Sequence, residues 1–359
     1  MKILHIAAIE NKPCCGTSVV IPYHVVAQQK ISDVGFINFR NGEFKDIKKQ
    51  YLCRSVFDFY KNLKLFGKPD LVVFHEVYIW QYIIVSAYLR RFKIPYIIIP
   101  HGSLTCNAQK YKCIKKKIGN SFLFYKFING AIALQFLSRI ELKSSNFGKV
   151  KFIGTNGITL PQLTKLNFNK NSLVFCYIGR LNIYYKGIDL LILAISKKAD
   201  VIREKKVDIK IYGPDEDNSR NKISNLIKKY NLSDIVSLNK EVFANEKEKV
   251  LLESDVFIQT SRTEGMPMGI LEAMSYGLPC LVTRGTSLVE LIEKYDAGWV
   301  CETNIESIIE CIVKCCQEID LFKTKGQNAR RLIEENFTWE KIARETIENY
   351  EKINNLGSI

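Results

Sequence analysis

The chain has 359 residues, more than one compact hydrophobic core holds and suited to two domains of about 150–180 residues each. Hydrophobic residues make up 47% and charged residues 25% of the composition, which excludes an intrinsically disordered chain. The positive charge is confined to the first half: residues 1–160 hold 24 Lys and Arg against 8 Asp and Glu, and the remainder holds 28 against 29. This imbalance predicts an anionic partner for the first half.

Simple features exclude several further classes of protein. Residues 1–6 already read as a strand, so we expect no secretory signal, and no apolar run approaches the roughly 20 residues that cross a bilayer. The eleven cysteines lack CxxC spacing, and none of the four histidines lies at a zinc-finger distance from a cysteine pair. We therefore expect reduced, mostly buried thiols in a cytoplasmic protein without a metal site.

Short apolar strands and helices alternate along the whole chain. In the first half, strands are expected at residues 2–9, 71–75, 96–100 and 152–154, followed by a polar linker at residues 163–171. In the second half, strands are expected at residues 173–179, 208–212, 236–238, 255–259 and 279–283, and helices at residues 186–197, 219–230, 246–253 and 268–276. This alternation predicts an α/β protein with two Rossmann-like domains, whose ligands bind beyond the carboxyl ends of the parallel strands.

The strongest motif is EGMPMGILEAM at residues 264–274, which follows an expected strand and begins a helix. Two glycines and a proline near the helix start leave backbone N–H groups bare for a phosphate. Glu264 and Glu272 should lie on the order of 10 Å apart, given a rise of about 1.5 Å per helical residue. That spacing is too long for a retaining glycosidase pair, although not for an inverting one. We interpret the two carboxylates as contacts to one extended ligand; the alternative is a buried helix with incidental glutamates. The residues expected to bind this ligand are Glu264, Gly265, Met266, Pro267, Met268, Gly269 and Glu272.

A second motif supplies positive charge. Gly179 ends an expected strand, Arg180 follows it, and Lys186 comes six residues later where a helix begins. Fixed cations stabilise the charge that develops on a departing phosphate more than they stabilise the ground state. We therefore expect this loop to bind a diphosphate.

The two motifs together resemble those of retaining glycosyltransferases of family 4, which carry an E-x7-E motif and a G-R-L…K-G element. The resemblance implies that Glu264 contacts the transferred sugar, Glu272 binds the ribose hydroxyls of the donor, and Arg180 and Lys186 bind its diphosphate. It also implies the GT-B fold, with two Rossmann-like domains facing each other across a central cleft and a C-terminal helix that crosses back. The first domain, residues 1–162 with about 339–359, would bind the acceptor, and residues 163–338 would bind the nucleotide sugar.

Two loops of the first half gain a role from the same resemblance. His101 follows the expected strand at residues 96–100, and the family's histidine in this loop contacts the donor sugar near the reacting carbon. Gly16 lies in the turn after the first strand, where family members often have two glycines that approach the donor phosphates. Here the pair is Cys15-Gly16, so a simple helix-start turn is the alternative.

Two other groups of residues have competing interpretations. Asp215, Glu216 and Asp217 have the form of a D-x-D metal motif, but they follow Gly-Pro after a strand and are interpreted as a solvated turn. His75-Glu76, after another expected strand, is either structural or faces the acceptor.

Residues 109–127 interleave lysines with aromatic and aliphatic residues. This pattern suits a segment that lies on an anionic membrane surface, and the alternative is a solvated helix with its other face in the core. No helix-turn-helix, zinc or RNP-like motif favours nucleic acid as the anionic partner. The lysines expected to contact the membrane or the acceptor are Lys110, Lys112, Lys115, Lys116 and Lys117.

The sequence therefore predicts a retaining glycosyltransferase that moves a sugar from a UDP-sugar, or alternatively a GDP-sugar, to a lipid-linked saccharide. The resemblance extends to enzymes of O-antigen and capsule synthesis, which places the expected site of action at the inner face of the cytoplasmic membrane. The nucleotide sugar is a substrate, and neither a cofactor nor a metal is expected. Alternatives are a phosphorylase or glycosidase using Glu264 and Glu272, and a membrane-surface scaffold of the same fold without catalysis.

Overall fold

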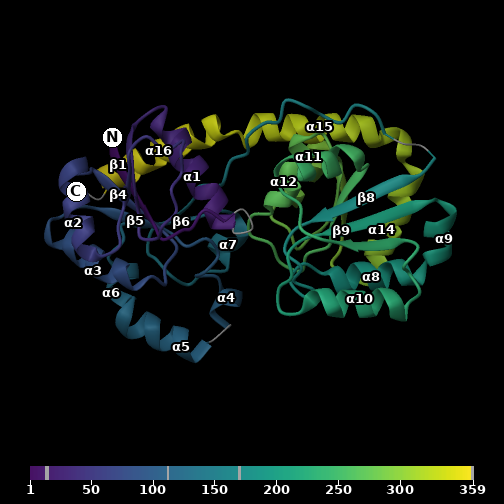
Figure 1. Ribbon diagram of the computed structural model, residues 1–359, viewed down its shortest axis with the longest axis horizontal. Helices are drawn as coiled ribbons and strands as arrows, with labels where there is room; N and C mark the ends of the chain where they lie inside the picture. The colour runs from purple at the N-terminus through teal and green to yellow at the C-terminus, as the bar shows by residue number, and fades with distance from the viewer. Residues whose placement is uncertain (13–15, 111–112, 169–170, 357–359) are drawn as a thin grey trace. The chain divides into compact units, whose positions relative to one another are not determined.

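The computed structural model describes residues 1–12, 16–110, 113–168 and 171–356. The chain divides into two compact units: residues 1–157 together with 339–359, and residues 158–338. Each unit is a parallel β-sheet with helices on both faces (Figure 1).

The sheet of the first unit has seven strands in the order β3-β2-β1-β4-β5-β6-β7. Its strands are β1 (Lys2–Ala7), β2 (Asp33–Asn38), β3 (Gln50–Leu52), β4 (Leu71–His75), β5 (Tyr96–Ile99), β6 (Ala133–Phe136) and β7 (Lys151–Ile153). Its helices are α1 (Gly16–Gln29), α2 (Val56–Phe66), α3 (Trp80–Arg91), α4 (Cys106–Lys110), α5 (Cys113–Ile118), the π-helix η1 (Gly119–Leu123), α6 (Tyr125–Asn129), α7 (Arg139–Lys143) and α16 (Trp339–Leu356).

Strand alternation separates the two faces of this sheet. Leu4 and Ile6 of β1 pack with Val72 and Phe74 of β4 into one core cluster, which the helices α2, α3 and α6 cover. Because successive side chains of a strand point to opposite faces, the residues between them face the other side. There α1 packs against the C-terminal helix α16 (Figure 1).

The sheet of the second unit has six strands in the order β10-β9-β8-β11-β12-β13. Its strands are β8 (Leu173–Ile178), β9 (Val207–Tyr212), β10 (Val236–Asn239), β11 (Val256–Gln259), β12 (Cys280–Thr283) and β13 (Gly298–Cys301). Its helices are α8 (Ile188–Lys197), α9 (Ala199–Glu204), α10 (Ser219–Lys229), α11 (Ala244–Glu253), α12 (Met268–Ser275), α13 (Val289–Tyr295), α14 (Ile305–Gln317), the 3₁₀ helix η2 (Ile319–Leu321) and α15 (Phe322–Asn336).

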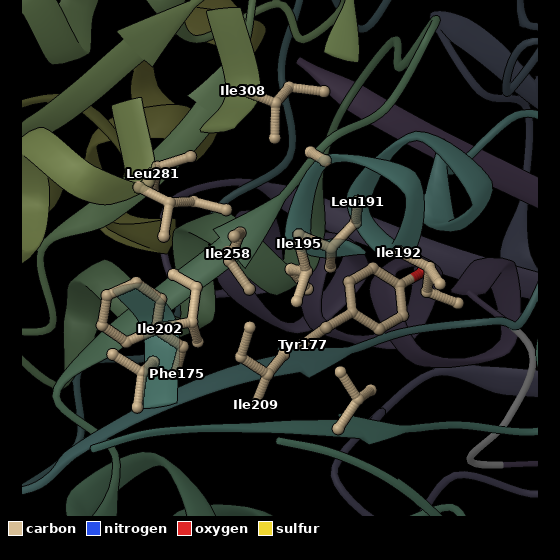
Figure 2. Close-up of a cluster of buried hydrophobic side chains, with 14 of the residues drawn as sticks. Phe175, Tyr177, Leu191, Ile192, Ile195, Ile202, Ile209, Ile258, Leu281 and Ile308 are labelled. Atoms are coloured by element: carbon tan, nitrogen blue, oxygen red, sulfur yellow. The ribbon is translucent and has the colours of Figure 1, made fainter. Parts of the chain in front are cut away.

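The two faces of the second sheet carry separate cores. Phe175, Tyr177 and Ile258 point to the face covered by α8, α10 and α14 (Figure 2). Cys176 and Phe257, which alternate with them, point to the face covered by α12, α13 and α15. Burial on both faces leaves only the ends of the strands for polar side chains, so the functional residues gather at the carboxyl ends.

The boundaries of the units differ slightly from the expected ones. The first unit ends at residue 157 rather than 162, because Ile158 donates its backbone N–H to Phe337 O at 2.6 Å and forms a bridge with Thr338. The return to the first unit falls at residue 339, where α16 begins.

Candidate functional site

In the second unit, Lys186 and Glu264 form a partly buried ion pair. Lys186 lies in the loop after β8, and Glu264 lies in the loop after β11. Their side chains are only 16% and 18% exposed. Gln259, the last residue of β11, donates from Nε2 to Glu264 Oε2 at 3.4 Å, and Glu264 donates its backbone N–H to Gly285 O at 2.8 Å. The loops after β8 and β11 therefore meet at this carboxylate, and the loop after β12 holds the backbone of Glu264.

A bidentate ion pair locks the two loops that carry Lys186 and Glu264. Arg262 donates to both carboxylate oxygens of Asp189 at 2.7 Å, and this pairing raises the pKa of the guanidinium. The same guanidinium donates to Tyr184 O at 2.8 Å and lies 4.5 Å from the centre of the Tyr184 ring. Fork-shaped pairs of this kind fix geometry as well as contributing energy, so the positions of Lys186 and Glu264 are set in advance.

Glu272 has a lysine partner of its own. Lys247, on α11, donates to Glu272 Oε1 at 2.8 Å, and both side chains are a little under a third exposed. Each glutamate of the EGMPMGILEAM motif is therefore neutralised by a lysine from a different element.

The stretch between the two glutamates forms the start of α12. Pro267 is the N-cap residue and, within the described part of the chain, no side chain caps the first turn. Gly269 packs against β8, because a Cβ on it would lie 2.9 Å from Ile178 O. Met268 N–H donates to Met266 O and Ile270 N–H donates to Pro267 O, both at 3.0 Å, so the N–H groups of this helix start are in part already satisfied rather than bare. The other residues assigned to the donor lie between Glu264 and Glu272: Gly265, Met266, Pro267 and Met268.

Arg180 lies at the same edge but is 61% exposed and paired differently. It donates to Glu216 Oε1 at 2.7 Å, and Asn182 Nδ2 donates to Glu216 Oε2 at 3.2 Å. Residues 215–217 form a largely exposed turn, as interpreted from the sequence, and Glu216 in addition orients the arginine of the second motif. The turn is held in place by the bridge between Leu181 and Asp215.

Glycines allow these loops to approach one another. Gly187 has φ +63°, and a Cβ there would lie 1.9 Å from Thr260 O. Gly179 directly follows β8, and a Cβ on it would lie 2.8 Å from the hydroxyl of Tyr177, which itself donates to Arg180 O at 2.9 Å. Close backbone contact between neighbouring loops thus depends on the absence of side chains.

The first-unit residues assigned by resemblance also lie at carboxyl ends of strands. His101 follows β5, adopts φ +48° and is half-buried, and burial lowers its pKa to about 4. Its Nε2 lies 3.0 Å from Nδ1 of His75, the last residue of β4. Gly16 begins α1, and among the described residues no atom lies within 4 Å of a Cβ built on it.

The lysine-rich segment consists of short helices over a pocket of about 610 Å³. Lys110, Lys115 and Lys117 are exposed, whereas Lys116 is half-buried and donates to Ala108 O at 2.6 Å. Lys112 lies outside the described residues. The exposed apolar side chains on these helices are Ile114, Ile118, Phe122, Leu123 and Tyr125. The pocket lining includes Cys106, Gln109, Cys113, Lys117, Ile128 and Phe147.

The described ranges contain neither a metal-binding group of side chains nor a membrane-spanning helix. There, no three or more His, Cys, Asp or Glu side chains are grouped so that they could hold a metal ion. No helix in those ranges combines the length and the apolar character needed to cross a membrane. Seven of the nine described cysteines are buried, all nine are free, and the exposed two are Cys106 and Cys113.

Known proteins are similar to this chain. Residues 161–332, a little under half of the chain, match the family described as Glycosyl transferases group 1. An uncharacterized glycosyltransferase of Methanocaldococcus jannaschii is 23% identical over 353 residues, which cover 93% of this chain and 90% of the relative.

Two further proteins are similar to the chain, one in sequence and one in fold. UDP-Gal:alpha-D-GlcNAc-diphosphoundecaprenol alpha-1,3-galactosyltransferase of Escherichia coli is 33% identical over 114 residues, 30% of this chain and 29% of that enzyme. The crystal structure of HepE from Anabaena in complex with UDP and glucose has a TM-score of 0.72 at 16% identity, covering 98% of this chain and 100% of that one. The chain has the GT-B fold.

Several residues that shape the site were not singled out from sequence. Lys247 and Gln259 contact the two motif glutamates, and Asp189 fixes the loop through Arg262. Gln259 gave one usable signal, since it is a polar residue that ends an apolar strand directly before the motif. Lys247 gave none, because nothing in the spacing of its helix points toward Glu272.

Proposed function

We propose that the chain is a retaining glycosyltransferase that moves a sugar from a nucleotide diphosphate, with UDP favoured over GDP, to a lipid-linked saccharide. The observation that carries this proposal is the pair of glutamate–lysine contacts that flank the start of α12. Glu264 with Lys186 and Glu272 with Lys247 place two carboxylates and two ammonium groups around one helix N-terminus. A nucleotide sugar offers hydroxyls for the carboxylates and a diphosphate for the cations and the backbone N–H groups.

Each site residue contacts a different part of the nucleotide-sugar donor. Glu272 accepts hydrogen bonds from the ribose hydroxyls, and Glu264 accepts from hydroxyls of the transferred sugar. Lys186 and Arg180 contact the diphosphate, where they stabilise the charge that forms as the bond breaks. Because these cations supply the positive charge, the reaction proceeds without a metal ion or other cofactor.

The chemical step is a substitution at the anomeric carbon. The bond from this carbon to the phosphate oxygen breaks, and its electron pair stays on the phosphate. The acceptor hydroxyl oxygen bonds to the same carbon from the face that the phosphate leaves. Its proton passes to the departing phosphate oxygen, so no separate base is needed. His101 contacts the transferred sugar near the reacting carbon.

The first unit binds the lipid-linked acceptor. Exposed Lys110, Lys115 and Lys117 lie among exposed Ile114 and Phe122, beside the apolar pocket of about 610 Å³. Cations with adjacent apolar side chains suit an anionic bilayer surface and a lipid diphosphate embedded in it. The Escherichia coli relative, whose name specifies a diphosphoundecaprenol acceptor, supports a lipid-linked saccharide here as well.

The decisive experiment is calorimetric binding of UDP, GDP, CMP and ADP, without added metal and with EDTA present. We expect the wild type to bind UDP, or failing that GDP, and Glu272→Ala to bind it about tenfold or more weakly. Glu248→Ala is the matched control, because this carboxylate lies on α11 beside the same helix and contacts Tyr276 instead.

Other outcomes separate the alternatives. If none of the four nucleotides binds at millimolar concentration, the transferase proposal fails and a scaffold without catalysis takes its place. Sugar release or phosphorolysis without a nucleotide sugar would instead identify a glycosidase or phosphorylase that uses the two glutamates.

A further inference from the structure

All four histidines of the chain gather in one buried, hydrogen-bonded row in the first unit. His101 Nε2 lies 3.0 Å from His75 Nδ1, and His75 Nε2 lies 2.9 Å from His5 Nδ1. His5 Nε2 lies 2.9 Å from Gln28 Oε1, and Gln28 Nε2 lies 2.8 Å from His24 Nε2. His5 and His24 have no role among those considered so far, and His75 was considered only as structural or as facing the acceptor.

The fold explains why these residues meet. His5 on β1 and His75 on β4 alternate with core residues of the opposite face, so both point toward α1 and α16. His24 and Gln28 are four residues apart on α1 and therefore share one side of that helix. His5, His75 and Gln28 are fully buried, and His101 at the end of the row is half-buried.

Beyond Gln28 the hydrogen bonds continue to a backbone carbonyl. Gln135 on β6 donates from Nε2 to Gly154 O at 2.9 Å, which leaves its Oε1 to accept from the hydroxyl of Tyr350 at 2.8 Å. Tyr350 lies on α16 and is fully buried, with Gln28 beside its hydroxyl. A carbonyl oxygen can only accept, so Gly154 fixes the orientation of the Gln135 amide and makes Tyr350 the donor to it.

The direction can be followed from one end to the other. The Gln28 amide presents Oε1 to His5 Nε2 and Nε2 to His24, and the nearby Tyr350 oxygen can take its second amide hydrogen because the hydroxyl proton of Tyr350 is used on Gln135. An amide oxygen can only accept, so His5 Nε2 donates to Gln28 Oε1. A neutral imidazole has one donor and one acceptor nitrogen, so His5 Nδ1 accepts from His75 Nε2. By the same rule, His75 Nδ1 accepts from His101 Nε2.

Burial keeps these rings uncharged, as this argument requires. It lowers the pKa of His5 and His101 to about 4 and the pKa of His24 and His75 well below the ordinary value. Each imidazole therefore has a defined tautomer at neutral pH, set by its neighbour.

We propose that His75, His5, Gln28 and Tyr350 are positioning residues that hold His101 with its proton on Nε2 and with Nδ1 unprotonated, as a hydrogen-bond acceptor. Nδ1 then accepts from a hydroxyl of the transferred sugar or of the acceptor. This inference rests on the proposed function, which gives His101 its contact with the sugar. The tautomer itself is a property of the free protein and can be measured without any substrate.

The first test is NMR of the ring nitrogens in histidine-labelled protein at neutral pH. Four histidines give few signals, and the long-range couplings distinguish a protonated nitrogen from an unprotonated one. We expect His5, His75 and His101 to be protonated on Nε2 and His24 on Nδ1. Any other pattern, such as a proton on Nδ1 of His101, overturns the proposal.

Variants of His75 test whether the row of hydrogen bonds affects the rate of sugar transfer. A glutamine offers one acceptor and one donor, as neutral histidine does, so His75→Gln preserves the direction of the bonds. His75→Leu interrupts them. We expect His75→Leu to lower kcat about tenfold or more with little change in the donor KM, and His75→Gln to retain most of the activity. Equal rates in both variants contradict a positioning role.

Tyr350→Phe covers the case in which His75→Leu fails to fold. This change removes one hydroxyl from α16, far along the row from His101, and keeps the packed ring. We expect a second tautomer of His101 to appear in the NMR spectrum, because the amide of Gln28 is then free to reverse. An unchanged spectrum overturns the proposal. If instead the measured tautomers match the expected ones and no nucleotide sugar binds, the proposed function is wrong, and the positioning of His101 by its neighbours still holds.

Discussion

At the scale of single residues, the candidate site consists of charges that already have partners. Lys186 contacts Glu264, Lys247 contacts Glu272, and Arg180 contacts Glu216. Ion pairs of this kind hold long side chains in one geometry before a ligand arrives, which lowers the entropy lost on binding. A diphosphate that binds here contacts a cation that already has a carboxylate partner, and it either displaces that carboxylate or shares the cation with it.

Lys186→Gln tests the importance of one of these charges. Loss of a fixed cation at a departing phosphate should lower kcat by about 10²–10³, or roughly 3–4 kcal/mol of transition-state stabilisation. Steady-state kinetics measure this directly. Lys198→Gln, at the opposite end of the adjacent α8, is the matched control and should retain full activity. Similar kcat values for the two variants would remove Lys186 from the reaction.

The sequence predicted these residues unevenly for physical reasons. Glu264, Glu272 and Lys186 are spaced along the chain in readable motifs, and the structure brings them to one edge of the sheet. Lys247 reaches Glu272 from a separate helix, and only the tertiary fold creates that contact. His5 was passed over because an isolated polar residue in an apolar strand gives no indication of its partner.

At the scale of elements, the turn between β8 and α8 is the part of the site with the least freedom. Gly187 is the N-cap of α8 in a left-handed conformation, pressed against the carbonyl of Thr260 on the neighbouring loop. A side chain here conflicts with both the backbone angle and the available space, so this glycine fixes how closely the two site loops approach.

Gly187→Ala should therefore destabilise the second unit. We expect a loss of about 1–3 kcal/mol in the free energy of unfolding, measured by urea denaturation, since strain and overpacking add. Gly16→Ala is the contrasting control, because no described atom lies near its Cβ and it begins a helix. That variant should be unchanged or more stable by up to about 1 kcal/mol. Equal destabilisation of the two would show that the close contact with Thr260 is unimportant.

Element prediction succeeded where apolar runs were continuous. The strand at residues 71–75 matches β4, and those at residues 208–212 and 255–259 match β9 and β11 to within one residue. β2 and β6 were missed, because Gly35 and Gln135 interrupt their apolar pattern and pairing with neighbouring strands holds them instead. No element was assigned from residue 284 to the C-terminal helix. The apolar residues of α14 nevertheless recur at helical spacing, a signal that was present: Ile308, Ile309, Ile312, Cys315 and Cys316.

At the scale of the whole molecule, two properties follow from where its ionisable groups lie. The buried histidines couple stability to pH, and the uneven distribution of lysine and arginine couples binding to ionic strength. Both can be measured on the intact chain without knowledge of its substrate.

Stability should fall in mild acid. An unfolded histidine titrates near pH 6.5, whereas burial lowers the pKa of His5 and His101 to about 4 in the folded chain. Between these values only the unfolded state binds the protons, so each histidine lowers the free energy of unfolding by up to about 1.4 kcal/mol per pH unit as pH falls. Above about pH 6.5 its contribution is complete and constant. Urea denaturation from about pH 7.5 to pH 5 should show this fall in the free energy of unfolding. In His75→Gln one buried histidine is absent, so the slope against pH should be shallower by the contribution of one histidine. A slope unchanged by that substitution would assign the acid sensitivity to other groups.

Membrane binding should depend on the lysines of α5. Neutralising Lys115 and Lys117 together should weaken binding to vesicles of anionic lipid by about 2 kcal/mol, or about 30-fold at low salt. Co-sedimentation measures this, with neutral vesicles as a reference. The matched control is the double change Lys228→Gln with Lys240→Gln, two exposed lysines of the second unit. Equal loss from both pairs would indicate general charge attraction rather than a docking segment.

The route of the chain has a consequence for biosynthesis. The first unit begins near the start of the chain, but its row of hydrogen bonds reaches Tyr350 and its α1 is covered by α16, both of which are translated after the second unit. A nascent chain thus carries an unfinished first unit, in which α1 lacks its cover, for as long as the second unit is being translated. His101 can acquire a single tautomer only after residue 350 has been translated, so a chain that stops after residue 332 would retain Glu264 and Glu272 and lack a finished row of histidines.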